Sequence, residues 1–359
     1  MLRSAIPYGS ILDVPGIQVG HHQRRGRGWE TGTTVVLAPG GATPAVDVRG
    51  GGPGTRETDA LEPHNLVETI HAVCLTGGSA FGLSAADGVM RVLEAEGLGV
   101  PVNGGVVPVV PTAVIFDLGR GGVFTNRPDP EFGARATSVA SGRRQRWGSV
   151  GAGTGARAAV LQGGIGTASA VVDTPTGGRL SVGAVAVVNA HGSVVDPSTG
   201  RLWEAPARTR PGGDERRALR AALETPQDAA RGRRLNTTIG VVATDAALTK
   251  AEAGKLASVA HNGLARAVRP SHSLFDGDTI FAMATGEQHI TAGATRFEVP
   301  ATHPGSLNAL FAAAADVFAL ACTHAILSAS TLGAPAYADL CPSVARANGV
   351  EVNGGGSAD

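Results

Sequence analysis

Short apolar and β-branched runs alternate along this chain with segments of helical periodicity. Residues 33–37, 45–48 and 71–75 have the composition and length of strands, and the last of them runs through two glycines into a helical pattern. That helix is expected to turn its apolar residues to the core: Leu83, Ala86, Met90 and Leu93. Because strand and helix patterns alternate throughout, the sequence predicts a layered α/β or α+β fold.

The amino-acid composition changes twice in the middle of the chain. Residues 150–188 are rich in glycine and carry repeated apolar runs, which predicts a set of packed strands. From about residue 204 to residue 235, Pro, Arg, Gly and acidic residues dominate instead. This stretch predicts a flexible linker that could contain a short helix near 217–223.

After this stretch the regular patterns return. Residues 237–243 alternate with period two, and Thr249 and Glu252 have the spacing of a capping box that opens a helix. Residues 276–284 predict another strand, and an alanine-rich helix at 307–327 completes the core. The alternation places one set of residues on a single face of the first strand: Thr237, Ile239, Val241 and Ala243.

Composition narrows the class of protein. With 359 residues, 43% hydrophobic and 17% charged, the chain predicts a compact globular protein of one large domain or two. The net charge is zero, which gives no electrostatic reason to expect nucleic acid or an anionic membrane as a partner. The helix at 307–327 contains Asn308, Asp316 and His324, so a buried helix is expected there rather than a membrane span.

The cysteines and the N-terminus predict a cytoplasmic protein. The three cysteines have no Cys-x-x-Cys spacing, so neither a disulfide framework nor a zinc site is expected. The first residues lack the apolar core of a signal peptide. The cysteines are Cys74, Cys322 and Cys341.

Motifs for bound cofactors are missing. The glycines at 151–155 lack the spacing of a dinucleotide loop, and no lysine precedes Lys250, which excludes a P-loop. The histidines form no metal-binding motif. His272 precedes the strand that begins at Asp276 and could approach a site, but a structural or surface role is the simpler interpretation. The sequence therefore predicts chemistry that needs no metal and no organic cofactor.

The dipeptide Asn236-Thr237 is the strongest candidate for chemistry. It stands where the basic stretch ends and the strand at 237–243 begins. Thr237 could simply be the first residue of that strand. If the chain cuts itself there, Thr237 becomes an N-terminal nucleophile whose hydroxyl attacks and whose α-amine accepts the proton. An α-amine titrates near ~8, which suits a base at neutral pH.

Three other polar residues could serve the same site. Asp276 and Asp278 are two residues apart, so on an extended strand both carboxylates would project to one face. From spacing alone, a polar Asp-Gly-Asp turn is the simpler interpretation. Asn189 ends a long apolar run, where a side-chain amide could donate to a developing oxyanion or merely terminate a strand.

Taken together, these motifs resemble the self-processing aminopeptidases of peptidase family S58. This family includes L-aminopeptidase/D-esterase, the β-peptidyl aminopeptidases and the endo-type nylon oligomer hydrolases. The resemblance covers most of the chain and is strongest over Asn236-Thr-Thr-Ile and Phe275-Asp-Gly-Asp-Thr-Ile-Phe. It is also carried by Ile11-Leu-Asp-Val-Pro-Gly, Ala45-Val-Asp-Val-Arg-Gly, Leu75-Thr-Gly-Gly-Ser, Gly148-Ser-Val-Gly and Gly163-Gly-Ile-Gly.

The resemblance implies a single catalytic domain, 1–359, folded as a four-layer αββα sandwich with the topology shared by these aminopeptidases and ornithine acetyltransferase. It implies cleavage between Asn236 and Thr237 into fragments 1–236 and 237–359, and assembly into a homo-oligomer, a tetramer of cleaved heterodimers. Thr237 would be the nucleophile and Asn189 an oxyanion donor. Asp276 and Asp278 match the positions that orient the new α-amine.

The aminopeptidase members of the family have serine as the nucleophile, and serine plus glutamate where this chain has Asp276 and Asp278, so Thr237 and the Asp-Gly-Asp motif resemble the nylon-hydrolase branch more. The sequence departs from that branch at two positions. The nylon-hydrolase branch carries a tyrosine where this chain has Phe116, and a lysine for which no counterpart is found near Arg157. We therefore expect an amide hydrolase acting on short peptides or amides, with nylon (6-aminohexanoate) oligomers as an alternative substrate. An acetyltransferase of the ornithine acetyltransferase type and a non-catalytic binding protein remain competing interpretations.

Overall fold

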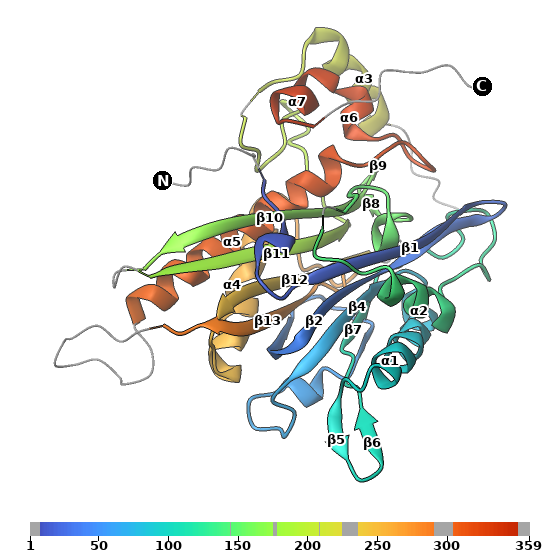
Figure 1. Cartoon of the computed structure of the whole chain (residues 1–359). Helices are drawn as coiled ribbons and strands as arrows, with labels where there is room; N and C mark the ends of the chain where they lie inside the picture. The colour runs from blue at the N-terminus through green and yellow to red at the C-terminus, as the bar shows by residue number, and fades with distance from the viewer. Residues whose placement is uncertain are drawn as a thin grey trace.

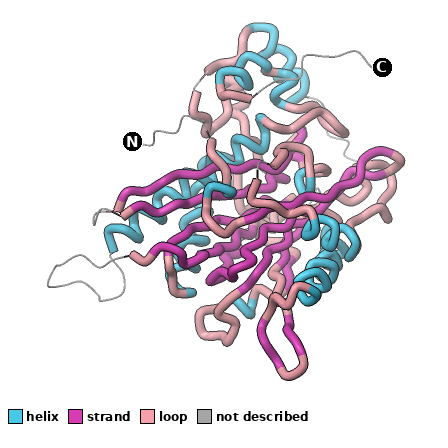
Figure 2. Tube along the Cα trace, in the orientation of Figure 1, coloured by secondary structure: helices cyan, strands magenta, loops and turns pink. Residues whose placement is uncertain are grey.

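The computed structural model describes residues 8–143, 145–174, 178–207, 209–224, 236–290 and 304–350. Strands form the centre of the molecule and helices cover it on two sides (Figures 1 and 2). The longer strands are β1 (Gln18–Gly26), β2 (Trp29–Val48), β4 (Ile70–Thr76), β10 (Gly164–Asp173), β11 (Arg179–Asn189), β12 (Thr237–Ala246) and β13 (Thr279–Gln288). The shorter ones are β3 (Thr55–Arg56), β5 (Val100–Val102), β6 (Gly105–Val107), β7 (Thr112–Val114), β8 (Arg157–Ala158) and β9 (Leu161–Gln162).

Seven α-helices and four short 3₁₀-helices lie in the described part of the chain. The α-helices are α1 (Ala85–Ala95), α2 (Pro130–Ser138), α3 (Gly213–Glu224), α4 (Lys250–Ala267), α5 (Pro304–Leu327), α6 (Tyr337–Leu340) and α7 (Pro342–Ala347). The 3₁₀-helices are η1 (Ile11–Asp13), η2 (Asp59–Leu61), η3 (Ser79–Ser84) and η4 (Gly151–Gly153). The expected capping box opens α4: the Thr249 hydroxyl accepts from the Glu252 amide, and the Glu252 carboxylate accepts from the Thr249 amide.

Strand β2 belongs to two sheets. Its first part pairs with β1 and β4, and its last part, 43–48, pairs with β13. The sheet with the order β1-β2-β4-β7-β3 is here called sheet A, and the sheet with the order β10-β11-β12-β13-β2 is sheet B. The two strands expected at 33–37 and 45–48 are thus halves of one long strand, because no turn separates them and each half finds its own partner.

Three apolar clusters separate four layers. The first lies between the sheets and includes Val36, Leu75, Val187, Ile239 and Phe281. The second packs sheet B against α4 and α5, and the third packs sheet A against α1 and α2. This arrangement confirms the predicted αββα sandwich. It also confirms that Ile239, Val241 and Ala243 share the face of β12 that points between the sheets.

Helix α5 is a core helix of this sandwich. It is the one helix in the described ranges that is long and apolar enough to cross a membrane, and 72% of its apolar window is buried inside the molecule. It packs closely on α4 at Gly263, where an added Cβ would lie 2.0 Å from the carbonyl oxygen of Ala315. The prediction of a buried helix at 307–327 is therefore confirmed.

The structure corrects the first part of the linker predicted at 204–235, which packs against the rest of the molecule. Glu204 forms an ion pair of 2.9 Å with Arg266 on α4, and α3 extends from 213 to 224. Leu219 on α3 is buried, and α3 packs against α6. The short helix expected near 217–223 is thus confirmed, and it begins four residues earlier than expected. The rest of the predicted linker, 225–235, lies outside the described residues.

Candidate active site

Asn189 and Thr237 lie side by side on neighbouring strands. The last residue of β11, Asn189, is paired directly with the first residue of β12, Thr237. Directly opposed residues of antiparallel strands project to the same face, and here that face is the space between the two sheets. Both residues are buried, Asn189 fully and Thr237 to 5% exposure. The structure thus brings together two residues that are 48 positions apart in the sequence.

The carbonyl oxygen of Asn236 receives two hydrogen-bond donors. The Thr237 hydroxyl donates to it, and so does the backbone N–H of Gly277, at 3.1 Å. The backbone N–H of Asn236 donates in turn to the Phe275 carbonyl, at 2.9 Å. These contacts form a parallel bridge that extends β12 by one residue toward the segment before β13. The backbone of Asn236 is therefore held at both its N–H and its carbonyl group.

Gly277 packs against the Thr237 hydroxyl. A Cβ added at Gly277 would lie 2.9 Å from Thr237 Oγ1, 2.7 Å from the Gly52 carbonyl oxygen and 3.0 Å from Pro53 Cα. Two of these neighbours are backbone atoms, which cannot move aside without shifting the chain. The glycine between the two predicted carboxylates is thus required by the space around the hydroxyl, a role that the sequence reasoning missed.

Asp278 holds the backbone next to the nucleophile candidate. Its Oδ1 accepts from the Thr238 N–H at 2.7 Å. Its Oδ2 accepts from both the backbone N–H and Nδ1 of His272, at 3.0 and 2.8 Å. His272, which the sequence reasoning took as a structural or surface histidine, is in fact a direct partner of a predicted site residue. Its ring also packs edge-on against the buried ring of His261.

Asp276 holds the loop on the other side of Gly277. Its Oδ1 accepts from the His191 N–H at 3.1 Å, and its Oδ2 accepts from the Ser273 N–H and hydroxyl at 3.1 and 2.5 Å. Both carboxylates therefore flank the junction, but β13 begins only at Thr279, so they do not stand on a regular strand as expected. Four of their six donors are backbone N–H groups.

The amide of Asn189 is held by two arginines that the sequence reasoning did not assign to the site. Its Oδ1 accepts from Arg120 Nη1 at 2.5 Å and from the backbone N–H of Arg157 at 3.0 Å. Its Nδ2 lies 3.4 Å from the carbonyl oxygen of Phe116. Phe116 thus contacts the Asn189 side chain through its backbone carbonyl. No local motif marks Arg120, which is 69 positions from Asn189.

Two acids complete a charged cluster around these arginines. Glu30 lies 3.5 Å from the Arg157 guanidinium, and their side chains are only 10% and 13% exposed. Asp117 accepts from the Thr31 hydroxyl and from a backbone N–H, both at 2.6 Å. Burial raises the pKa of Asp117 to about 6, against the lowering effects of the Thr31 hydrogen bond and the Arg120 charge. Burial also raises the pKa of Glu30, which Arg157 and Arg120 oppose.

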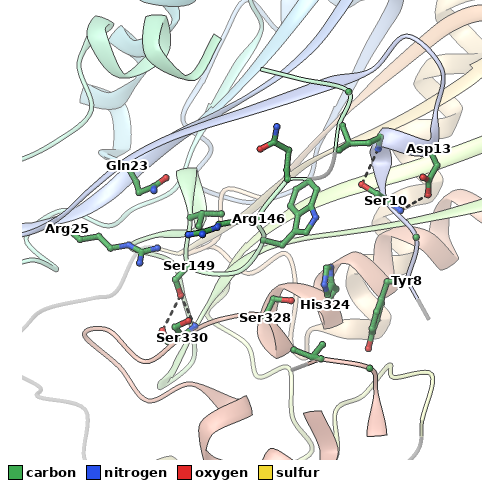
Figure 3. Close-up of a pocket in the computed structure, with 18 residues that line it drawn as sticks. Tyr8, Ser10, Asp13, Gln23, Arg25, Arg146, Ser149, His324, Ser328 and Ser330 are labelled. Carbon is green, nitrogen blue, oxygen red and sulfur yellow. Dashed lines mark hydrogen bonds between the residues drawn. The ribbon is translucent and has the colours of Figure 1, made fainter. Parts of the chain in front are cut away.

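Two other kinds of site could support a reaction in the described part of the chain: a metal centre and a cavity. Within the described ranges, no group of three or more His, Cys, Asp or Glu side chains could hold a metal ion. A cavity of about 1120 Å³ lies beside β1, η1 and the end of α5, with Tyr8 next to His324 and Ser149 bonded to Ser330 on its wall (Figure 3). Neither Thr237 nor Asn189 lines it. The junction is therefore the better candidate for catalysis.

Comparison with known proteins decides the family. Residues 9–338 match the model of peptidase family S58. The chain belongs to peptidase family S58. It is accordingly a hydrolase of peptide or amide bonds. Within the family, it is 47% identical to an uncharacterized aminopeptidase of Mycobacterium leprae over 99% of both chains. It is 30% identical to a 6-aminohexanoate-oligomer endohydrolase of Paenarthrobacter ureafaciens, over 82% of this chain and 81% of that one.

Solved structures of similar shape support the fold of this S58 peptidase. The L-aminopeptidase D-Ala-esterase/amidase of Ochrobactrum anthropi, described as a variant of the Ntn (N-terminal nucleophile) hydrolase fold, superposes with a TM-score of 0.72 at 20% identity over 97% of both chains. A β-aminopeptidase of Burkholderia sp. gives 0.71 at 22% identity over 98% of both. The predicted Ntn-hydrolase-like architecture is thereby confirmed.

Proposed function

We propose that this S58 peptidase cleaves itself between Asn236 and Thr237 and then works as an N-terminal-threonine amide hydrolase. One observation carries the proposal. The Thr237 hydroxyl donates a hydrogen bond to the carbonyl oxygen of Asn236, and the same oxygen accepts a second hydrogen bond from the Gly277 N–H. A nucleophile and a donor for the developing negative charge thus meet at the same peptide group.

In the self-cleavage step, Thr237 Oγ1 attacks the carbonyl carbon of Asn236. The negative charge forms on the Asn236 oxygen, where the Gly277 N–H stabilises it. The C–N bond then breaks, and the hydroxyl proton passes to the departing nitrogen, which leaves an ester between Asn236 and Thr237. Water hydrolyses this ester to the Asn236 carboxylate, a free Thr237 hydroxyl and a free α-amine.

In the mature enzyme the same hydroxyl attacks the amide carbonyl of a substrate. The α-amine of Thr237 accepts the hydroxyl proton and returns it to the leaving amine, and water then releases the acyl group. Asn189 donates Nδ2–H to the oxyanion in this proposal, which its pairing opposite Thr237 on the same face supports. Asp278 fixes the Thr238 N–H and with it the direction of the nucleophile strand.

We propose short peptides or amides with a free amino end as substrates. The relatives named aminopeptidases, which match almost the whole chain, favour this class. A nylon oligomer is the second candidate, because the Asp276-Gly277-Asp278 motif flanks the nucleophile here and relatives with that activity are 30% identical.

The test compares three forms of the purified chain by intact mass. The wild type should appear as the fragments 1–236 and 237–359, and Thr237→Ala as one 36.0 kDa chain without amidase activity. Thr237→Ser retains a hydroxyl and should still cleave. A wild-type chain that stays whole while hydrolysing amides would contradict the proposed mechanism.

A further inference from the structure

We propose that Arg120 is a positioning residue, which orients and polarises the Asn189 amide so that Nδ2 donates to the oxyanion. The inference rests on the proposed function, in which Asn189 is the oxyanion donor. It assigns a role to a side chain that no motif in the sequence marks.

The contacts of Asn189 leave its amide only one orientation. An amide oxygen has two acceptor positions, and here Arg120 Nη1 and the Arg157 N–H occupy both. If the amide were rotated by 180°, the Nδ2 hydrogens would point at these two donors, and the buried Oδ1 would lose both of its hydrogen bonds. Nδ2 has two hydrogens, of which the long 3.4 Å contact to the Phe116 carbonyl engages one. The other Nδ2 hydrogen is then available to donate into the space between the Asn189 and Thr237 side chains.

The guanidinium also strengthens the donor. A hydrogen bond from a charged group draws electron density toward the amide oxygen, and this makes the N–H groups on the same amide better donors. The effect is large only where water is excluded, and Asn189 is fully buried. Arg120 itself is fixed by a second bond to the Gly155 carbonyl, so that its position does not depend on Asn189 alone.

Arg157 offers a matched comparison within the same site. It meets the same amide oxygen, but through its backbone N–H, while its side chain faces Glu30. Replacing the Arg157 side chain therefore removes a buried positive charge without removing a hydrogen bond to Asn189. Replacing Arg120 removes both the charge and the bond. The difference between the two variants isolates the contact with the amide.

The experiment measures kcat and KM on an amino-acid p-nitroanilide, per mole of cleaved enzyme determined by intact mass. Arg120→Met should lower kcat roughly 10- to 100-fold with little change in KM, as expected for one charge-assisted hydrogen bond that acts in the transition state. Arg120→Lys, which keeps a charged donor, should recover part of this loss. Arg157→Met should lower kcat by a much smaller factor.

A double-mutant cycle separates positioning from a general structural effect. If Arg120 acts through Asn189, adding Arg120→Met to Asn189→Ala should cost little more than Asn189→Ala alone. Additive losses, or a kcat of Arg120→Met equal to that of the wild type, would overturn the inference while leaving the proposed function intact. A wild-type enzyme without amidase activity would instead overturn the proposed function and this inference with it. If Arg120→Met does not fold, the same double-mutant cycle with Asn189→Ala is measured with Arg120→Lys.

Discussion

The two flanks of Thr237 differ in the kind of group that forms them, side chains on one flank and backbone on the other. On the β11 side, the site consists of side chains: the Asn189 amide, held by Arg120 and surrounded by buried charges. On the side of 276–278, it consists of backbone: the Gly277 N–H touches the Asn236 carbonyl, and the two carboxylates bind mainly backbone amides.

This difference suggests a division of labour. The backbone flank contacts the peptide group that is proposed to break, and we propose that it serves self-cleavage. The side-chain flank borders the space opposite Thr237, and we propose that it serves the substrate. A backbone donor is set by the fold and is present as soon as the chain folds. A side-chain donor needs its own positioning, which is the role proposed for Arg120.

Apart from the loss of the Thr237 hydroxyl itself, the largest effect on the rate of self-cleavage is expected from Gly277→Ala, which changes the backbone flank. The added methyl would meet Thr237 Oγ1 at 2.9 Å and the Gly52 carbonyl at 2.7 Å, so the hydroxyl or the N–H donor must move. We expect self-cleavage to slow by ~100-fold or more, the usual cost of losing one oxyanion donor. Time-resolved gel analysis of fresh protein measures this rate. Gly254→Ala on α4, where a Cβ meets nothing within 4 Å, is the control; equal rates for the two variants would refute the role of Gly277.

Asn189→Ala tests the side-chain flank. It should reduce kcat by ~10²–10³-fold. Its effect on self-cleavage should be smaller than that of Gly277→Ala, because the Asn236 oxygen takes its donors from Thr237 and Gly277. Comparing cleavage rate and turnover in the same two variants checks the division of labour. The proposed division of labour is wrong if Asn189→Ala slows self-cleavage as much as Gly277→Ala does.

The same contrast explains what the sequence could predict. The strand at 237–243, the capping box at Thr249 and the layered fold follow from local periodicity, and all three are confirmed. Asn189 was noticed because it ends an apolar run, and its place opposite Thr237 follows from strand pairing. Its catalytic role remains a prediction.

Sequence reasoning missed what depends on contacts between distant segments. Arg120 has no local signal, since its partner lies 69 positions away. Gly277 looked like a turn residue, and only the approach of Thr237 Oγ1 explains why a side chain does not fit. The oxygens of Asp276 and Asp278 accept from backbone amides, the His272 ring and the Ser273 hydroxyl, partners that their spacing in the sequence does not reveal. Their role in orienting the α-amine stays a prediction. The resemblance to a family named the residues but not their geometry.

Asp278→Asn should weaken the backbone flank without removing a reacting group. The carboxylate accepts three hydrogen bonds on its two oxygens, and an amide can accept only on one of them. We expect a loss of about 1.5–3 kcal/mol in the free energy of unfolding, typical of a hydrogen bond to a charged group. Urea denaturation measures it. The exposed pair of Arg56 and Asp87 supplies the control, since Asp87→Asn should change stability by less than ~0.5 kcal/mol. Equal stabilities of the two variants would show that Asp278 is not structural.

The smallest effect concerns pH, and the two flanks should respond with opposite signs. Burial raises the pKa of Asp117, beside Arg120, to about 6, so the stability that its protonated form contributes is present below pH 4 and lost as the pH rises through about 6. Burial lowers the pKa of His261, beside His272, to about 4, so its contribution is present above pH 6.5 and lost as the pH falls toward 4. Between pH 6.5 and 4 the two slopes oppose each other. Asp117→Asn should therefore make the free energy of unfolding fall more steeply on acidification, and His261→Gln should make it fall less steeply. Urea denaturation at several pH values measures both slopes; changes of the same sign would show that the two flanks do not differ in this way.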